Sequence, residues 1–289
     1  MRGNATAKIS FIASMVVFGT IGAFVKGVAL SSAEIALWRA VMAVALIGAY
    51  LLLTRQKIPF RKMKKELVLL IVSGMAMAFN WIFLFEAYKN TTVSVATLSY
   101  YFAPVIVTVV CPLLFKERLG KLGWICSLVS FVGLVMVVGV GEITGEGHAL
   151  GIIFGLLAAV LYAAVIILNK LIRGVVGIHR TFLQFVSAVA VLLPYVLLSG
   201  GIKATILSTE GIILLITVGI LHTGIAYCVY FSSLTKMPGQ ESAILSYIDP
   251  LVAVIVSVAL LGELITPWQI VGGALILGGA LVNEICRKE

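Results

Sequence analysis

The stretch LSYYFAPVIVTVVCPLLFKERLG, residues 98–120, returns in altered form as LSYIDPLVAVIVSVALLGELIT, residues 245–266. Pro104 aligns with Pro250 and Glu117 aligns with Glu263, and both pairs are 146 residues apart, about half of the 289-residue chain. Two such pairs at one offset indicate an internal duplication, and a duplication of this length decides the architecture.

The composition predicts that the chain lies in a membrane. Hydrophobic residues make up 61% of the sequence, charged residues only 11%, and the mean hydropathy is +1.15. Soluble domains carry roughly 25% charged residues, and a soluble fold of this length cannot hide so much apolar surface. The sequence also lacks the short alternating strands of a membrane β-barrel.

Ten segments are apolar and long enough to cross a bilayer as helices, which takes roughly 20 residues each. The links between most of them are short, so neighbouring helices are expected to run antiparallel. The first apolar core, residues 9–25, is too long for a signal peptide, and we assign it to the first span. The predicted spans are residues 8–28, 34–54, 67–88, 92–115, 121–141, 149–169, 181–199, 210–233, 241–262 and 267–285.

The basic residues predict how the chain is threaded, because cytoplasmic loops are rich in Lys and Arg. With a cytoplasmic N-terminus, seventeen of the 21 basic residues fall in cytoplasmic segments, and the exceptions are Lys26, Arg39, Lys89 and Lys203. We therefore expect a multi-pass protein of the inner or plasma membrane with both termini in the cytoplasm. The net charge of +9 then reflects topology and attraction to anionic lipid, and not nucleic-acid binding.

The two repeats, residues 1–142 and 148–289, hold five predicted spans each. Because five is odd, the second repeat enters the membrane from the opposite face, and the halves are inverted copies. Inverted repeats place a site near the midplane and expose it to each side in turn. We therefore expect an all-α membrane protein with ten transmembrane helices, two inverted five-helix repeats around a central cavity, and transport by alternating access.

The repeated pattern is similar to that of a known family. FLFEAYKNTTVSVATLSYYFAPVIVTVVCPLLFKERL, from Phe83, and YFSSLTKMPGQESAILSYIDPLVAVIVSVALLGELIT, from Tyr230, each hold a proline within the fourth helix of the repeat and a glutamate thirteen residues later. A Gly-rich fifth helix follows, GGALILGGALV. The chain resembles the EamA-type members of the drug/metabolite transporter superfamily.

This resemblance implies a central cavity between the first four helices of each half, with the fifth helices, near 121–141 and 267–285, packed behind. It also implies a secondary transporter of small organic metabolites such as amino acids or amines. The resemblance favours efflux, with import as the alternative. Proton coupling and facilitated diffusion are both compatible with it.

Pro104 and Pro250 each lie within a predicted span. Proline removes one helical hydrogen bond and clashes with the carbonyl four residues earlier. In a membrane such freed carbonyls face protein or a water-filled cavity. Two interpretations stand: a kink that shapes the site and flexes between states, or a static kink that aids packing.

Asp249 is the sharpest difference between the copies, because its counterpart is Ala103. It lies roughly 12 Å from the inner end of its predicted helix, where an ionisable group costs about 2.5–3.5 kcal/mol. We predict that it binds a cationic group or exchanges a proton; the alternative is an Asp satisfied by the kinked backbone or a Ser or Tyr neighbour. His222, near the midplane, is a candidate proton relay or an ordinary packed histidine.

Arg39 and Glu86 fall at similar depth on the outer side. We expect a salt bridge between them that closes the outer mouth, with Lys26 and Glu34 extending the cluster. Alternatively, Arg39 grips a carboxylate or phosphate as a fixed bidentate donor.

Aromatic and amide side chains fall at depths that fit a cavity. Aromatic rings with polar edges suit amphipathic metabolites, and their faces suit cations; some of these residues are expected to serve packing instead. Besides Arg39, the candidate substrate-binding residues are Trp38, Asn80, Trp81, Tyr100, Tyr101, Tyr162, Tyr227, Tyr230 and Tyr247.

Other chemistry is not indicated. The histidines and cysteines form no metal-ligand spacing, and no ATP-binding G-x-x-x-x-G-K-[ST] motif is present, so we expect no cofactor. A membrane-embedded enzyme that uses Asp249 and His222 is a rival from another class, without a nucleophile to support it. The expected partners are a small-molecule substrate and the lipid bilayer, and the glycines of residues 272–279 permit packing within a monomer or a weak dimer.

Overall fold

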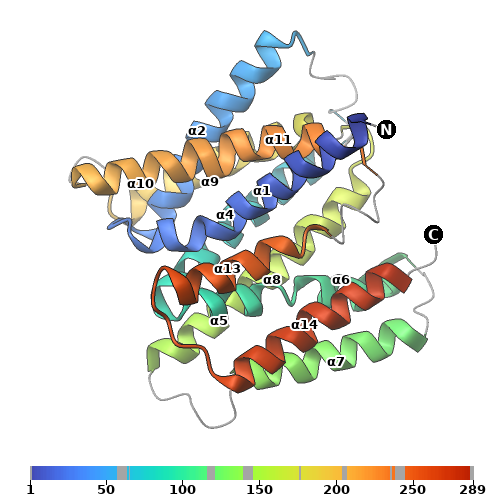
Figure 1. The fold of residues 1–289 in the computed structure, drawn as a ribbon. Coiled ribbons are helices and arrows are strands. Elements are labelled where there is room, and N and C mark those ends of the chain that lie inside the picture. Colours follow the sequence, from blue (N-terminus) through green and yellow to red (C-terminus); the bar gives the residue numbers. More distant parts are fainter. Residues whose placement is uncertain are drawn as a thin grey trace.

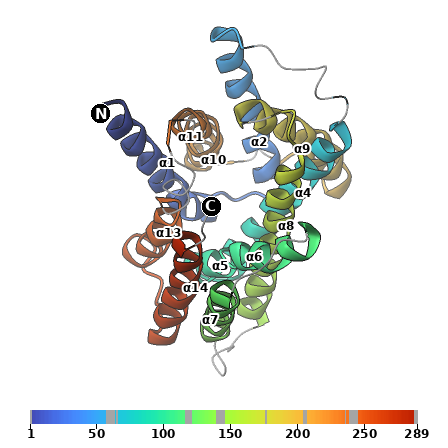
Figure 2. The ribbon, with the colours of Figure 1, turned by 90° about the vertical axis from the view of Figure 1, so that its right-hand side faces the viewer.

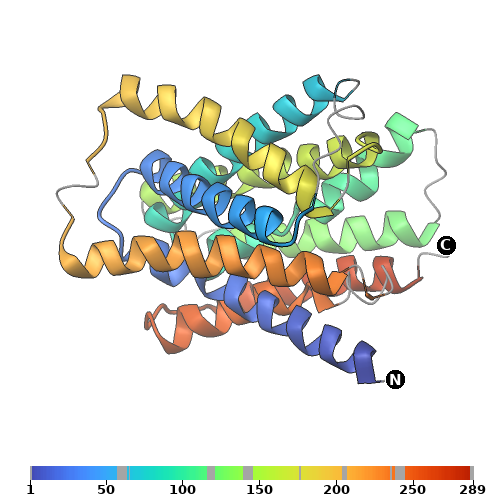
Figure 3. The same ribbon diagram turned by 90° about the horizontal axis from the view of Figure 1, so that it is seen from above.

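The computed structural model of this chain describes residues 2–56, 64, 66–115, 121–138, 146–175, 177–203, 207–234, 236–237 and 245–286. Every regular element in these ranges is a helix. Most of the helices run along the length of the molecule (Figure 3). The elements, labelled as in Figure 1, are α1 (Arg2–Lys26), α2 (Ser32–Leu53), α4 (Leu67–Asn90), α5 (Val93–Tyr100), α6 (Ala103–Phe115), α7 (Lys121–Val138), α8 (Glu146–Leu171), α9 (Gly177–Ser199), α10 (Thr209–Gly219), η2 (Ile220–Ile225), α11 (Ala226–Leu234), α13 (Ile248–Ala259) and α14 (Pro267–Cys286).

Seven helical segments are long and apolar enough to cross a membrane. They coincide with seven of the ten predicted spans. The other three predictions correspond to shorter apolar helices, Lys121–Val137, Ile248–Ala259 and Pro267–Asn283. Residues 139–141 and 241–244 of the predicted spans, and Glu117, lie outside the described residues. The chain is therefore a multi-pass, all-helical membrane protein.

Consecutive long helices run in opposite directions, so the links between them lie alternately at the two ends of the molecule. The link between α1 and α2 lies at one of these ends. We call this the Lys26 end of the molecule, and we call the opposite end, where α2 finishes, the Tyr50 end. At the Lys26 end, α2, α5 and α10 are each preceded by a residue whose hydroxyl group accepts a hydrogen bond from a free backbone N–H of the first turn. These caps, each 3.2 Å long, are Ser31 with Glu34, Thr92 with Val95, and Ser208 with Gly211.

The predicted fourth span consists of two helices, α5 and α6, with a turn between them. Pro104 is the second residue of α6, where its missing N–H would have no helical partner in any case. The Phe102 carbonyl accepts hydrogen bonds from the backbone N–H groups of Val105 (3.0 Å) and Ile106 (3.2 Å) and closes the first turn of α6. Pro250 is the third residue of α13, which also follows a turn. Both prolines thus stand in the first turn of a new helix.

α7 and α14 pack side by side along one edge of the molecule (Figures 1 and 2). Gly133 and Gly272 face each other, and a Cβ on either would stand 2.5 Å from the other's carbonyl oxygen. A Cβ on Gly279 would stand 2.9 Å from the Cys126 carbonyl oxygen. At the 146-residue offset, Gly279 is the counterpart of Gly133, and Gly272 is the counterpart of Cys126. If the two halves are exchanged, the contact of Gly133 with Gly272 becomes the contact of Gly279 with Cys126. α7 and α14 are antiparallel, because residue numbers rise along α7 in the direction in which they fall along α14.

The remaining contacts between the halves follow the same exchange. α1 packs on α13 and on the run from α10 to α11, while α8, the first helix of the second half, packs on α5, α6 and α4. α2 packs on its own counterpart, α9. The main core lies among α2, α4 and α9, where Ile47, Phe85 and Phe185 are fully buried. The polar side chains of the candidate site, among them Arg39 and Asp249, lie between the two halves that are packed in this way.

Candidate functional site

Asp249 connects the two broken helices. Its Oδ2 atom accepts a hydrogen bond of 2.6 Å from the hydroxyl of Tyr101, the C-cap residue of α5. α1 lies directly against the start of α13, because a Cβ on Gly19 would stand 2.5 Å from the Asp249 carbonyl oxygen. The half-buried carboxylate therefore lies where α1, α5 and α13 meet. Its counterpart, Ala103, is fully buried and has no polar side chain.

Six of the predicted aromatic residues form two groups of ring contacts between the halves: Tyr100 with Tyr101 and Tyr162, and Tyr227 with Tyr230 and, through Phe185, with Trp81. Tyr162 stacks on Tyr100 with ring centroids 5.1 Å apart, and Phe185 lies 5.1 Å from Trp81 and 5.2 Å from Tyr227. Tyr162 is within electrostatic range of Asp249 and Tyr227 and yet keeps 36% exposure, so it borders accessible space on that side. We call the following residues the central aromatic cluster: Trp81, Tyr100, Tyr101, Tyr162, Tyr227 and Tyr230.

Arg39 of α2 lies beside this cluster and is only 4% exposed. Its guanidinium carbon is 4.4 Å from the centre of the Trp81 ring and 5.3 Å from that of Phe85. Its Nε atom donates a hydrogen bond of 3.1 Å to the Thr223 hydroxyl. A desolvated cation–π contact contributes about 2 kcal/mol, whereas burying an ion costs on the order of several kcal/mol. These neighbours therefore offset only part of the cost of burying Arg39.

The salt bridge expected between Arg39 and Glu86 does not form in the described part of the chain. Trp81 and Phe85 are four residues apart and present one face of α4 to Arg39. One further residue turns the side chain by about 100° around the helix. Glu86 accordingly points elsewhere and lines a cavity of about 500 Å³ at the Lys26 end, together with Glu34.

The hydroxyl partner of Arg39 lies in the π-helical segment η2. Thr223 donates to the carbonyl of Val218, five residues earlier, at 2.8 Å, and this bond fixes the hydroxyl oxygen that receives Arg39. Gly224 next to it lets α2 approach, because a Cβ there would stand 2.3 Å from Leu46. Single π turns within α-helices are rare and frequently mark functional sites.

His222 occupies the same π segment and faces α1. Its Nδ1 atom donates to the Thr217 carbonyl at 3.2 Å, and its Nε2 atom lies 2.9 Å from the Thr20 hydroxyl, which donates to the Val17 carbonyl at 2.8 Å. Within the described residues, no hydrogen bond joins His222 directly to Asp249. The two are connected through α1, where Thr20 directly follows Gly19.

Asn80 and Trp38 make no ring contact with the cluster in the described ranges, whereas Tyr247 lies within electrostatic range of Tyr162. Asn80 donates a hydrogen bond of 2.7 Å to the Ala158 carbonyl and ties α4 to α8. The indole Nε1 of Trp38 is enclosed without an acceptor among the described residues. Tyr247 lines a separate cavity of about 320 Å³ next to Pro104, bordered by α7 and α14.

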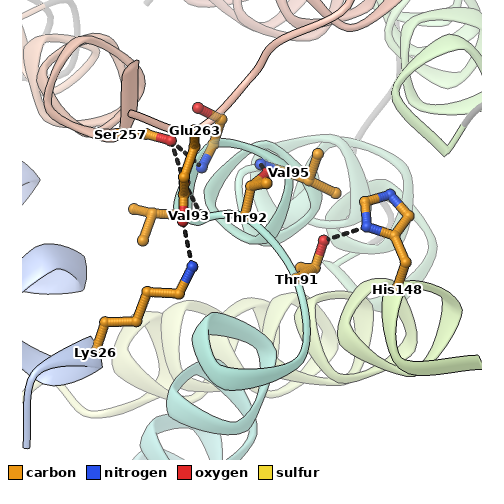
Figure 4. A network of polar contacts seen from close by, with 9 residues as sticks. Lys26, Thr91, Thr92, Val93, Val95, His148, Ser257 and Glu263 are labelled. Carbon is orange, nitrogen blue, oxygen red and sulfur yellow. Dashed lines mark hydrogen bonds and ion pairs between the residues drawn. The ribbon is translucent and has the colours of Figure 1, made fainter. Parts of the chain in front are cut away.

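Glu263 ties three helices together at the Lys26 end (Figure 4). Its carboxylate pairs with Lys26, the last residue of α1, and accepts a hydrogen bond from the Ser257 hydroxyl of α13. Its Oε2 atom also accepts from the backbone N–H of Val93, the first residue of α5, at 2.7 Å. A carboxylate at a helix start is favoured by the helix dipole. We call Lys26, Val93, Ser257 and Glu263 the Glu263 network.

Polar contacts join the halves at both ends of the molecule, and at the Tyr50 end Glu66 accepts from the backbone N–H groups of Arg173 and Gly174 at 2.8 Å. At the Lys26 end, further polar contacts join the halves: Thr91 with His148 at 2.7 Å (Figure 4), and the Lys203 backbone N–H with Glu34 at 2.6 Å. At the Tyr50 end, a cavity of about 670 Å³ opens between α1, α2 and α11, next to Tyr50. In the described ranges, no three His, Cys, Asp or Glu side chains are grouped so that they could hold a metal ion.

The model of the EamA-like transporter family matches this sequence twice, over residues 6–139 and 149–284. The chain belongs to the EamA-like transporter family. This EamA-like protein is therefore a member of a family of membrane transporters.

Two relatives of this EamA-like transporter also bear transporter names. The "Uncharacterized transporter YxxF" of Bacillus subtilis is 29% identical over 289 residues, which is 99% of this chain and 92% of the relative. An "Uncharacterized transporter" of Archaeoglobus fulgidus is 31% identical over 198 residues, 68% of each chain. A solved crystal structure matches 99% of this chain and 100% of its own with a TM-score of 0.65; at 17% identity it shows a shared fold alone.

Sequence reasoning missed several residues of this EamA-like transporter. Thr223 and Thr20 carry the polar contacts of Arg39 and His222, and Phe185 links Trp81 to Tyr227. A histidine followed by a threonine near the middle of an apolar span was the one available signal. Glu263 was recognised only as a marker of the repeat, because its partners lie far away along the chain.

Proposed function

We propose that this protein is a secondary transporter that moves small organic metabolites across the inner or plasma membrane by alternating access, in the direction of export. The single observation that carries this proposal is the exchanged packing of the two halves. α7 on α14 and α2 on α9 are each a helix packed on its own counterpart, and the first pair is antiparallel. A two-fold relation that reverses helix direction supports two inverted repeats, residues 1–142 and 148–289, with ten spans of which three are short.

The distribution of basic residues supports cytoplasmic termini, which places the Lys26 end outside the cell. The Glu263 network would then be the closed outer gate, in place of the Arg39–Glu86 pair that we first expected. The cavity near Tyr50 would open toward the cytoplasm. This cavity is larger than the one at the Lys26 end, about 670 against about 500 Å³, which supports an inward-facing conformation.

The central aromatic cluster is the proposed solute site. Asp249 lies beside it on the matched helix breaks, and we propose that this carboxylate binds a cationic group or carries the coupling proton. His222 is proposed to act on the same step through Thr20 on α1. Pro104 and Pro250 would allow α6 and α13 to move relative to the segments that precede them.

Purified protein in sealed proteoliposomes tests the proposal. The vesicles are loaded with a pool of unlabelled amino acids and amines, and uptake of each labelled solute is followed with and without a pH gradient. Accumulation of at least one solute by exchange is expected, with Asp249→Asn as the coupling-deficient variant. Chemical turnover of a solute in detergent, without flux in vesicles, would favour a membrane enzyme and contradict the proposal.

Direction is tested in cells. An exporter confers tolerance to an external excess of its own solute, because the cytoplasmic concentration stays low. An importer instead raises the cytoplasmic concentration of the labelled solute. Enhanced accumulation in energised cells that express the protein would contradict export and would leave the transporter assignment intact.

A further inference from the structure

Arg39 has unused hydrogen-bonding capacity. A guanidinium carries five N–H donors, and in the described part of the chain only the Nε–H of Arg39 has an acceptor, the Thr223 hydroxyl. Its Nη1 and Nη2 atoms have no acceptor there. They are nevertheless absent from the set of polar atoms that are fully enclosed without a hydrogen-bond partner. These two atoms therefore keep some accessible surface, although Arg39 as a whole is only 4% exposed.

Arg39 also lacks a balancing charge. No described acid forms a salt bridge with Arg39: Asp249 accepts from Tyr101, Glu34 accepts from the Lys203 backbone, Glu263 pairs with Lys26, and Glu86 lines the cavity at the Lys26 end. A charged side chain this deeply buried is almost always paired. In a membrane span, an unpaired one marks the path of an ion or substrate.

The surroundings of Arg39 have the form of a binding site. The rings of Trp81 and Phe85 cover the face of the guanidinium and fix its plane. The hydroxyl groups of Tyr88, Tyr100 and Tyr227 lie within electrostatic range of it. A fixed guanidinium edge that lacks an acceptor, beside aromatic walls, is complementary to a planar anion attached to an apolar group.

We propose that Arg39 binds the carboxylate of the transported solute, so that the substrates are small organic acids, including amino acids. This inference rests on the proposed transport function and names its substrate class. A carboxylate is planar and accepts two parallel N–H bonds from one guanidinium. Its single negative charge matches the single charge of Arg39, whose guanidinium lies against the rings of Trp81 and Phe85.

A phosphate ester fits less well. It carries a charge of about −1.5 to −2 at neutral pH, and among the described residues no second Arg or Lys acts electrostatically on Arg39. Part of the phosphate charge would therefore remain unbalanced in a dry site. An inorganic anion such as chloride would balance the charge but would leave the aromatic walls without a function.

The test uses matched acids and amides on the full-length protein in detergent. The probes are the proteinogenic amino acids and benzoate, each beside its primary amide, with inorganic phosphate and chloride as further probes. Thermal stabilisation reports binding, and counterflow in proteoliposomes reports transport. Each active acid is expected to bind at least about 30-fold more tightly than its amide, because the amide leaves the Arg39 edge without an anion.

Two variants test the residue itself. Arg39→Gln is expected to abolish the preference for acids over amides, and Arg39→Lys to weaken acid binding while keeping some preference, because Lys is charged but not bidentate. Arg173→Gln, at an exposed arginine in the link between α8 and α9, is the matched control and should bind as wild type does. If Arg39→Gln does not fold, the binding of acids and amides by Arg39→Lys and by the wild-type protein still tests the proposal.

The outcomes separate the two proposals. Transport of amines or amides as well as of acids, or an unchanged acid preference in Arg39→Gln, overturns the carboxylate site and leaves the transporter proposal standing. Binding of chloride or phosphate alone also overturns it. If no solute crosses the vesicle membrane, the transporter proposal fails first and the carboxylate site falls with it.

Discussion

The two helix breaks, YYFAP at residues 100–104 and YIDP at residues 247–250, share a backbone arrangement and differ in chemistry. In each, a turn precedes a proline that stands in the first turn of the next helix. In one, the residue before the proline is the fully buried Ala103. In the other it is Asp249, which accepts a hydrogen bond from Tyr101 of the opposite half.

This comparison teaches that the duplicated halves keep the same packing while one of them alone carries the charged group. Inverted repeats need similar helices so that two conformations of similar energy exist. Coupling to an ion or proton needs one group at a defined place. A single acid in one repeat supplies the coupling group and leaves the helices of the two repeats similar. The following predictions test the difference first and the similarity afterwards.

The largest effect is expected from Asp249→Asn, which makes the two breaks chemically alike. Asparagine has nearly the same size and can still bond to Tyr101, but it carries no charge and exchanges no proton. Transport driven by a pH gradient should fall by at least about 100-fold, because a positioned group that transfers a proton contributes a factor of about 100 to 10,000. Uptake in proteoliposomes measures this, with Glu210→Gln at the exposed start of α10 as the control. Full coupling in Asp249→Asn would contradict a role for this carboxylate.

Tyr101→Phe should give a smaller loss. It removes the one described donor to the Asp249 side chain and keeps the ring that packs 5.7 Å from Tyr100. A hydrogen bond to a charged group contributes about 1.5–3 kcal/mol, so solute affinity should fall by about tenfold to 100-fold. Titration of the transport rate against solute concentration reports the change. Tyr195→Phe, at an exposed tyrosine of α9, should leave affinity as it is.

The close packing of α7 on α14 predicts losses of stability from Gly133→Ala and Gly272→Ala, two glycines that face each other. In each variant the new methyl group would stand 2.5 Å from the carbonyl of the other glycine, so α7 and α14 must separate. We expect each change to cost about 1–3 kcal/mol, measured as a lower midpoint of thermal unfolding in detergent. Gly278→Ala on the same helix meets nothing within 4 Å and should not destabilise. Gly279→Ala, at the counterpart of Gly133, should destabilise as well, and a loss confined to one of these two positions would contradict the proposed two-fold relation.

The smallest effects on stability are expected from Pro104→Ala and Pro250→Ala. Each proline stands in the first turn of its helix, where no helical hydrogen bond is regained on substitution. Stability should change by less than about 1 kcal/mol in both variants, through the freedom of the unfolded chain. The same unfolding assay applies. A large change in one variant alone would show that the two breaks are not equivalent.

Much of the fold could be predicted from the sequence, because hydropathy and a shared offset are properties of the chain itself. The spans, the helix break at Pro104 and the gathering of the tyrosines with Trp81 depend on local pattern or on depth along a helix. The depth of a residue along its helix does not determine the direction in which its side chain points around the helix axis. Arg39 and Glu86 lie at similar depth, yet only Arg39 points at the face formed by Trp81 and Phe85.

The contacts that the sequence did not predict all depend on how distant segments are placed. The pairing of Lys26 with Glu263 joins residues 237 positions apart and needs the relative position of the halves. Thr223 reaches Arg39 from a π turn, for which the sequence of α10 and α11 gives no specific signal. Such contacts follow from tertiary packing, which hydrophobic periodicity does not encode residue by residue.

The central claim is that the halves rock against each other and open the two ends in turn. Spin labels on a cysteine-free background test it directly, one pair at Ala29 and Leu264 at the Lys26 end and one pair at Leu53 and Lys236 at the Tyr50 end. Distances are measured by electron double resonance in wild type and in Glu263→Gln, which removes the charge that holds Lys26. The account predicts that the Lys26-end distance lengthens in the variant while the Tyr50-end distance shortens. If both distances lengthen together, or neither changes, alternating access about the Glu263 network is contradicted.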